Sequence, residues 1–134
     1  MASQEQIDLF LASPAFGVVG ASANRYKYGN KVLRCYLQHG RRAIPVNPNE
    51  KEIEGVPCVG SITDLSPEVK SISMITPPQV TEQLVPVAIQ KGITGIWMQP
   101  GAESAAAVKL CKENNINVIA DGSCILVVLG YSDH

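Results

Sequence analysis

Five short apolar runs, each ended by a turn sequence, constrain the fold of this chain more than any other feature. They cover residues 15–19, 42–46, 71–75, 95–98 and 117–120. Segments with helical spacing of apolar residues separate them, so strands and helices alternate at intervals of about 25 residues, as in βαβ units. Because crossovers between parallel strands are right-handed, the alternation predicts an α/β fold: a Rossmann-like, doubly wound, five-stranded parallel sheet in three layers.

The segments between these runs predict four helices. Residues 4–12 carry a short amphipathic stripe, and we expect residues 1–13 to form an N-terminal helical cover. Further helices are expected over residues 29–39, 78–91 with a kink at Pro86, and 103–113. The run 125–129 fits a helix or a strand, because its period does not separate the two. The length of 134 residues predicts a single domain over residues 1–134.

Composition and charge exclude several classes of protein. No apolar run approaches the roughly 20 residues that span a bilayer, and the first residues lack a basic region, so we expect a cytoplasmic protein that does not enter membranes. A net charge of −1 gives no general attraction to nucleic acid. The four cysteines are widely spaced and have no neighbouring pair of histidines, which predicts free thiols and no metal site.

Residues 16–29 (F-G-V-V-G-A-S-A-N-R-Y-K-Y-G) predict a strand, a tight turn and the start of a helix. Glycine lets the backbone approach a ligand closely, and a helix N-terminus attracts anions, so such a loop can hold a phosphate. The dinucleotide fingerprint G-x-G-x-x-G is only partly present, because Ser22 takes the second glycine position and the third glycine is displaced to Gly29.

The charge pattern around this loop is more specific. Between Phe10 and Asn49 the sequence has no acidic residue, whereas six basic residues fall there: Arg25, Lys27, Lys31, Arg34, Arg41 and Arg42. We interpret Lys31 and Arg34, which fall within the expected helix, as a solvated surface. The other four are candidates for contact with phosphate groups.

A distinctive turn follows each predicted strand. Ligands of open parallel sheets bind outside the carboxyl ends of the strands, where the strand order reverses. We therefore expect the turns to converge on one ligand site. They are Gly20-Ala21-Ser22, Asn47-Pro48, Thr76-Pro77-Pro78, Gln99-Pro100-Gly101 and Asp121-Gly122-Ser123-Cys124.

The end of the second strand bears on the type of nucleotide. An NAD site places an acidic residue there to bond the ribose, but this chain has Asn47. Arg41 and Arg42 flank the strand and suit a further ribose phosphate, as in NADP or coenzyme A, because guanidinium groups pair with phosphate bidentately. Hydride transfer also calls for a separate substrate domain, and the sequence predicts none, which favours coenzyme A over NADP.

Five motifs in chain order now carry a resemblance. They are V-G-A-S at 19–22, I-P-V-N-P at 44–48, T-P-P at 76–78, W-M-Q-P-G-A at 97–102 and D-x-x-C at 121–124. Over residues 16–124 the chain resembles the small stand-alone CoA-binding proteins, which are similar in turn to the N-terminal CoA-binding domain of the succinyl-CoA synthetase alpha subunit.

The resemblance implies roles for particular residues. Pyrophosphate contacts fall to the loop: Gly20, Ala21, Ser22, Arg25, Lys27 and Gly29. Arg41 or Arg42, together with Asn47 and Pro48, is expected at the ribose or its phosphate. The adenine side falls to Thr76, Pro77 and Pro78, and Gln99 completes the candidate ligand-binding set.

Three functions follow, in this order of preference. The first is binding of coenzyme A or acyl-CoA by a non-catalytic binding or regulatory module, whose protein partner the sequence does not identify. The synthetases phosphorylate a histidine in a later domain that this chain lacks, which argues against acyl-CoA synthesis. The second is an NADP-type enzyme or a thiol enzyme that uses Cys124. The third is an interaction domain with a vestigial nucleotide pocket.

Overall fold

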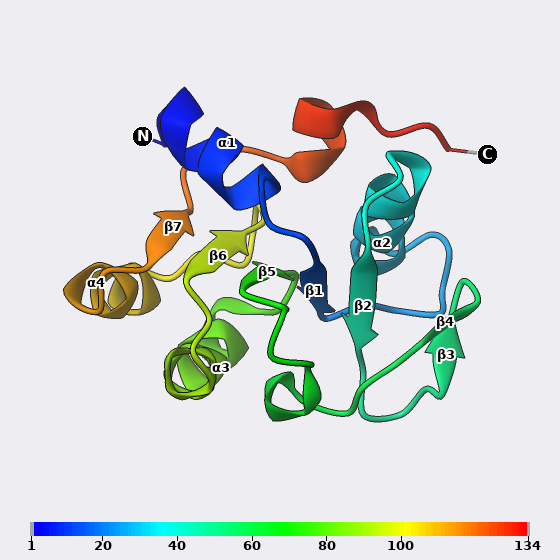
Figure 1. Cartoon of the computed structure of the whole chain (residues 1–134), viewed down its shortest axis with the longest axis horizontal. Helices are drawn as coiled ribbons and strands as arrows, with labels where there is room; N and C mark the ends of the chain where they lie inside the picture. Colours follow the sequence, from blue (N-terminus) through cyan, green and yellow to red (C-terminus); the bar gives the residue numbers. More distant parts are fainter. Residues whose placement is uncertain (1, 134) are drawn as a thin grey trace.

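A computed structural model describes residues 2–133 and has at its centre a sheet of five parallel strands (Figure 1). The strands run in the order β2-β1-β5-β6-β7, which is the doubly wound order with its switch point between β1 and β5. Their positions confirm the predicted fold class. The bounds are β1 Phe16–Val19, β2 Ala43–Val46, β5 Ser71–Met74, β6 Gly95–Met98 and β7 Asn117–Ile119. Met1 and His134, the ends of the predicted domain range 1–134, lie outside the described residues.

Helices cover both faces of the sheet (Figure 1). α3 (Pro78–Lys91) and α4 (Ala105–Glu113) pack on one face through buried residues such as Val85 and Ala107. α1 (Gln4–Leu11), α2 (Tyr28–Gln38) and the π-helix η2 (Leu126–Gly130) cover the other, where Phe10 and Tyr36 are fully buried. The run 125–129, which fitted helix or strand, is therefore helical. Within residues 2–133, no helix has the length and hydrophobicity needed to cross a membrane.

A small hairpin interrupts the segment between β2 and β5. β3 (Glu52–Ile53) and β4 (Val56–Pro57) pair antiparallel around Glu54 and Gly55, which have φ angles of 52° and 78°. Both residues lie in the left-handed region that a tight two-residue hairpin turn requires. A 3-10 turn, η1 (Ile62–Asp64), follows before β5. The hairpin lies beside the loop that leads into α2 (Figure 1).

Two glycines allow close backbone approaches at the end of β1: Gly20 to the residue that follows β5, and Gly29 of α2 to Gly20. Gly20 has a φ of 96°, and a Cβ there would lie 2.3 Å from the carbonyl oxygen of Ile75. A Cβ on Gly29 would lie 2.1 Å from the carbonyl oxygen of Gly20. Gly29 thus does what the third glycine of a dinucleotide loop does, since it allows close packing of helix on strand. The displaced glycine of the sequence pattern preserves that function.

We expect Gly29→Ala to lower the free energy of unfolding by about 1–3 kcal/mol, because the new methyl group meets backbone atoms that move only if the whole loop shifts. Gly60→Ala is the matched control, since the nearest atom to its Cβ is Asp64 Oδ2 at 3.7 Å. That change should stay within about 0.5 kcal/mol. Urea denaturation measures both, and equal midpoints for the two variants would contradict the close-packing account.

Candidate functional site

A cavity of about 530 Å³ opens at the carboxyl edge of the sheet, beside the switch point. Val80, Leu84 and Val87 of α3 give it an apolar wall, and Ser61 and Thr63 from the η1 segment add hydroxyl groups. Its volume and mixed lining are those of a small-molecule site. Five of the predicted site residues line this cavity: Gly20, Ala21, Asn47, Pro48 and Thr76.

The loop after β1 forms one rim of this cavity and is held by its own side chains. The hydroxyl of Ser22 accepts from the amide of Asn24 at 3.1 Å, and Asn24 Oδ1 accepts from the amide of Tyr26 at 3.0 Å. Asn47 Nδ2 donates to the carbonyl of Ala21 at 3.0 Å, which joins the turns after β1 and β2. The loop is therefore shaped by local polar contacts although it is poor in glycine.

The start of α2 faces this loop without a side-chain cap. Lys27 is the N-cap residue and makes no capping hydrogen bond, and the first turn of the helix contains no acidic residue. Arg25 and Lys27 are exposed beside it. Uncapped amide groups, the positive end of the helix dipole and nearby cations together favour an anion at this position.

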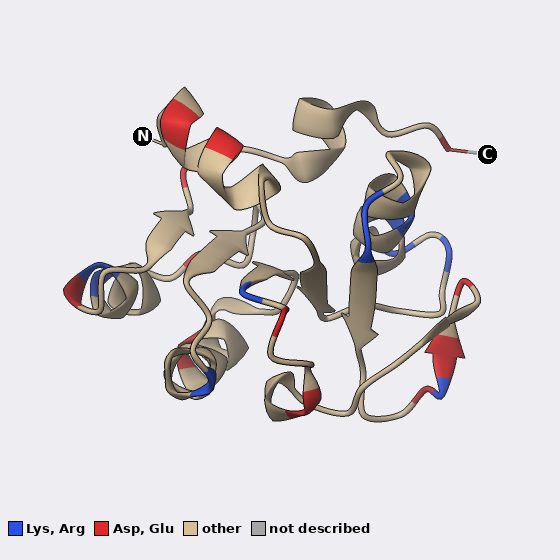
Figure 2. Cartoon of the chain, viewed as in Figure 1, with Lys and Arg blue, Asp and Glu red and all other residues tan. Residues whose placement is uncertain are grey.

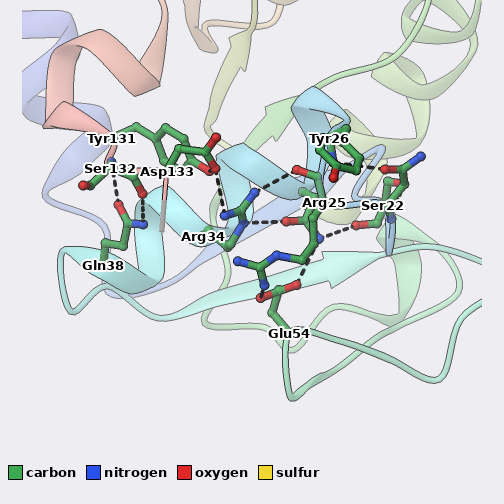
Figure 3. Close-up of polar contacts among 11 residues, drawn as sticks. Ser22, Arg25, Tyr26, Arg34, Gln38, Glu54, Tyr131, Ser132 and Asp133 are labelled. Atoms are coloured by element: carbon green, nitrogen blue, oxygen red, sulfur yellow. Dashed lines mark hydrogen bonds and ion pairs between the residues drawn. The ribbon is translucent and has the colours of Figure 1, made fainter.

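The buried side chain of Arg34 in α2 holds the loop after β1 in place through hydrogen bonds (Figure 3). Its Nε donates to Asn30 Oδ1 at 2.6 Å and its Nη2 donates to the carbonyl of Arg25 at 2.8 Å. Asn30 in turn donates from Nδ2 to the carbonyl of Ser22 at 2.8 Å. Arg34 is only 6% exposed, so the interpretation of this residue as part of a solvated surface is wrong.

The C-terminal segment lies along α2 and contacts the same arginine (Figure 3). Asp133 Oδ1 is 3.3 Å from Arg34 Nη1, and the guanidinium carbon lies 5.4 Å from the centroid of the Tyr131 ring. Hydrogen bonds from Tyr131 and then from Arg34 lower the pKa of Asp133. Gln38 exchanges two hydrogen bonds with the backbone of Ser132. Segments about 100 residues apart in sequence thus support the loop.

The hairpin supplies an internal counterion to the loop. Arg25 Nη1 lies 2.6 Å from Glu54 Oε1, and Asn30 Nδ2 donates to Glu54 Oε2 at 3.3 Å. Figure 2 shows acidic residues on the hairpin next to the basic residues of the loop and α2. The six cations that the sequence places together are therefore partly neutralised by acids from distant segments.

Arg41 and Arg42 lie at the opposite edge of the sheet. Both precede β2, at whose carboxyl end Asn47 sits, and about 16 Å of extended chain separates Arg42 from Asn47. Arg41 donates to the carbonyl of Leu11 and Arg42 forms an ion pair with Glu68. We correct their predicted placement at the ribose phosphate, because residues that enter a parallel strand lie at its amino edge.

Residues 76–78 lie in the turn between β5 and α3, and Gln99 lies at the end of β6. Thr76 bonds Thr81 through their hydroxyls at 2.7 Å, Pro77 lines a smaller hollow of about 230 Å³, and Pro78 begins α3. Gln99 is fully buried at the end of β6, where its Oε1 accepts from the hydroxyl of Tyr28 and from the amide of Ile125, each at 3.0 Å. It therefore lies beneath the edge and does not line the main cavity.

A larger hollow of about 720 Å³ runs along α4 and contains none of the predicted site residues. Its lining includes Lys109, Lys112 and Glu113, which are side chains of an exposed helix surface. The polar turns at the carboxyl edge meet at the smaller cavity, so we take that cavity as the candidate site.

Sequence reasoning missed Asn30, Arg34 and Glu54. The spacing of Asn30 and Arg34, four residues apart on one helix face, permits the contact that they make. The pair Glu54-Gly55 is a turn signal, and its residues form the hairpin turn. Contacts between Glu54 and a loop 29 residues away have no local sequence signal.

A doubly wound parallel sheet with a polar cavity and a helix start at its switch point defines a nucleotide-type binding domain. Residues 15–130 match the family described as CoA binding domain, and the chain belongs to this family. It is homologous to the CoA-binding region of ADP-forming acetate–CoA ligases, which confirms the family resemblance inferred from the five motifs.

Individual relatives show how far this similarity extends. The ADP-forming acetate–CoA ligase II of Archaeoglobus fulgidus is 32% identical over 90 residues, which is 66% of this chain. An uncharacterised protein of Bacillus subtilis is 28% identical over 123 residues, covering 90% of this chain and 88% of that protein. The chain spans only 13% of the Archaeoglobus ligase and 14% of the corresponding ligase of Methanocaldococcus jannaschii.

The fold is also that of known structures. A conserved hypothetical protein from Pyrococcus furiosus superposes with a TM-score of 0.81 and 38% identity, covering 85% of this chain and 97% of that one. A hypothetical protein from Pyrococcus horikoshii superposes with a TM-score of 0.87 and 25% identity, covering 95% and 89%. Both are similar to this chain over nearly their whole length.

We expect Arg34→Met to lower the free energy of unfolding by about 3 kcal/mol. It removes two short hydrogen bonds of a charged group, each worth about 1.5 kcal/mol. The longer third bond, to the exposed Asp133, adds little. Lys31→Met, one turn away on the half-exposed side of α2, is the control and should change stability by less than about 0.5 kcal/mol. Limited proteolysis should also cut the Arg34 variant faster within residues 22–27. Equal stability of the two variants would refute a structural role for Arg34.

Proposed function

We propose that this protein binds coenzyme A or an acyl-CoA at the carboxyl edge of its sheet and acts as a non-catalytic binding or regulatory module. The observation that carries the proposal is the continuity of the site. The Asn47 to Ala21 hydrogen bond joins the cavity to the loop, and the loop leads directly to the uncapped start of α2. Membership of the CoA binding domain family supports the choice of ligand.

The pyrophosphate belongs at the start of α2. The backbone from Gly20 to Ser22 and the exposed Arg25 and Lys27 surround this position, and Gly29 keeps the helix close enough to present its amide groups. Arg25 must exchange its bond to Glu54 for a bond to phosphate. The exchange keeps the guanidinium paired in both states, whereas Glu54 keeps its hydrogen bond from Asn30 and loses its ion pair.

The adenosine part belongs in the cavity. Its apolar wall from α3 suits a base, and Asn47, Pro48 and Thr76 line the same space beside the loop. Pro77 and Pro78 fix the start of α3 at this edge. No acidic residue ends β2, where an NAD site has the acid that bonds the ribose.

Calorimetric titration with CoA, dephospho-CoA, NADP and NAD tests the proposal. We expect CoA to bind more tightly than either nicotinamide nucleotide. Tighter binding of NADP would favour the NADP-type alternative. If millimolar CoA gives no signal, the pocket is vestigial and the interaction-domain alternative gains support.

Two arginine variants locate the phosphates within that titration. Arg25 and Arg42 are similarly exposed, with 51% and 57% of their side chains accessible, and each is paired with a glutamate. Arg25→Ala should weaken CoA binding about tenfold, as expected for one charged hydrogen bond. Arg42→Ala, at the opposite edge, should leave the affinity unchanged. The reverse result would move the phosphates to the amino edge.

Glu54→Gln is expected to raise the affinity for CoA, whereas Arg25→Ala is expected to lower it. The Glu54→Gln change keeps the shape of the side chain and removes the charge that competes with phosphate for Arg25. We expect CoA to bind up to about fivefold more tightly, since an ion pair with a half-exposed arginine is worth about 1 kcal/mol. Weaker binding would mean that Glu54 itself contacts the ligand.

A further inference from the structure

Cys124 is a thiol at the carboxyl edge of the sheet, in the turn that follows β7. It is partly exposed, whereas Cys35 and Cys111 are fully buried. Burial raises the pKa of each of these two thiols to about 11, which keeps them protonated and unreactive. Cys58, which follows β4, is also partly exposed and serves as the natural comparison.

The sulfur of Cys124 belongs to a polar cluster. Its Sγ is 2.6 Å from the hydroxyl oxygen of Tyr28, whose proton is donated to Gln99 Oε1 at 3.0 Å. Burial, and next the hydrogen bond to Cys124, raise the pKa of Tyr28, so this hydroxyl keeps its proton. Tyr28 can therefore receive a hydrogen bond from the thiol of Cys124 and can turn its own proton toward a Cys124 thiolate.

Gln99 adds an independent observation that points to a ligand. Its side chain is fully buried, and its Nε2 has no hydrogen-bond partner. The amide orientation is fixed, because Oε1 must accept from the backbone N–H of Ile125, the residue after Cys124. A buried donor without an acceptor costs free energy. Here it lies in the same cluster as a partly exposed thiol, where an acceptor such as a ligand carbonyl would satisfy it.

The cluster is next to the proposed phosphate position. Tyr28 is the first residue of α2 and follows the N-cap residue Lys27 directly. A ligand whose pyrophosphate binds at that helix start can reach the cluster if it carries a flexible arm. A carbonyl on the arm would accept from Gln99 Nε2, and a sulfur at its end would meet Cys124. The arm of coenzyme A carries both a terminal thiol and amide carbonyls.

We infer that Cys124 is a covalent attachment site for the thiol end of a CoA-type ligand, forming a mixed disulfide with the ligand held by Tyr28 and Gln99. The inference rests on the proposed function. The docked ligand thus modifies Cys124 of the protein that binds it, and this modification blocks the Cys124 thiol.

The step is a thiol–disulfide exchange with the disulfide form of coenzyme A. The Cys124 thiolate attacks one sulfur of that disulfide, a new S–S bond forms to Cys124, and the ligand's own S–S bond breaks. The second CoA leaves as a thiolate and takes up the proton that Cys124 released. One disulfide is consumed and one is formed, so the ligand disulfide is the only oxidant.

Mass spectrometry of peptides from the intact protein, digested without reductant, tests this step. CoA disulfide and glutathione disulfide are compared at equal concentration. At each cysteine, the ratio is the rate of modification by CoA disulfide divided by the rate of modification by glutathione disulfide. At Cys124 this ratio should be at least about tenfold, because docking raises the effective concentration of the reacting sulfur. At Cys58 it should be near one. The ratio cancels intrinsic differences between the two thiols, and Cys124→Ser should remove the fast adduct.

Two variants sharpen the result. Arg25→Ala should lower the ratio at Cys124 by weakening docking while the glutathione disulfide rate stays the same. Tyr28→Phe should slow both reagents at Cys124 by about tenfold, the loss of a hydrogen bond to a charged sulfur, and should leave Cys58 unaffected. An unchanged rate in Tyr28→Phe would contradict the role of that hydroxyl.

Calorimetry on the same samples separates the two proposals. If CoA binds but the ratio at Cys124 equals that at Cys58, the covalent site is overturned and the proposed function stands. If CoA does not bind and the ratio is near one at both cysteines, both proposals fail. Tight binding with a high ratio at Cys124 alone supports both.

Discussion

The close approach of Gly29 to the carbonyl of Gly20 is the contact on which the rest of the site depends. It sets the first turn of α2 against the end of β1, so Lys27 and Tyr28 reach the carboxyl edge of the sheet. A side chain at Gly29 would push the helix away from the loop, because its Cβ would meet the backbone of Gly20 and Ala21. The uncapped helix start, the cavity rim and the Cys124 cluster all follow from this one packing constraint.

In the part of the chain that the structure describes, three of the six clustered cations are paired with acidic residues of the same protein. Glu54 pairs with Arg25, Asp133 with the buried Arg34, and Glu68 with Arg42. The positive charge of this stretch is therefore reduced, and Lys27 at the start of α2 keeps an exposed charge. In the proposed binding mode, a phosphate replaces Glu54 as the partner of Arg25, and an exchange of this kind favours a multivalent phosphate over a single carboxylate.

Much of the fold could be predicted, because its signals are local. Short apolar runs that end in glycine or proline turns define the five strands, and parallel pairing brings their carboxyl ends to one edge. The burial of Arg34 could not be predicted, since its partners Arg25 and Asp133 come from separate segments. The position of Arg41 and Arg42 did follow from strand direction, because residues that precede a strand lie at its amino end. Their guanidinium groups suit a phosphate, but strand direction places them away from the site.

Backbone amide NMR of the protein titrated with CoA tests the central claim most directly, because it locates the ligand without a substitution. The account predicts shifts concentrated at residues 20–29, Asn47 and Thr76, with no change at Arg42 or Glu68 on the opposite edge. Shifts confined to the hollow along α4 or to the amino edge of the sheet would contradict it.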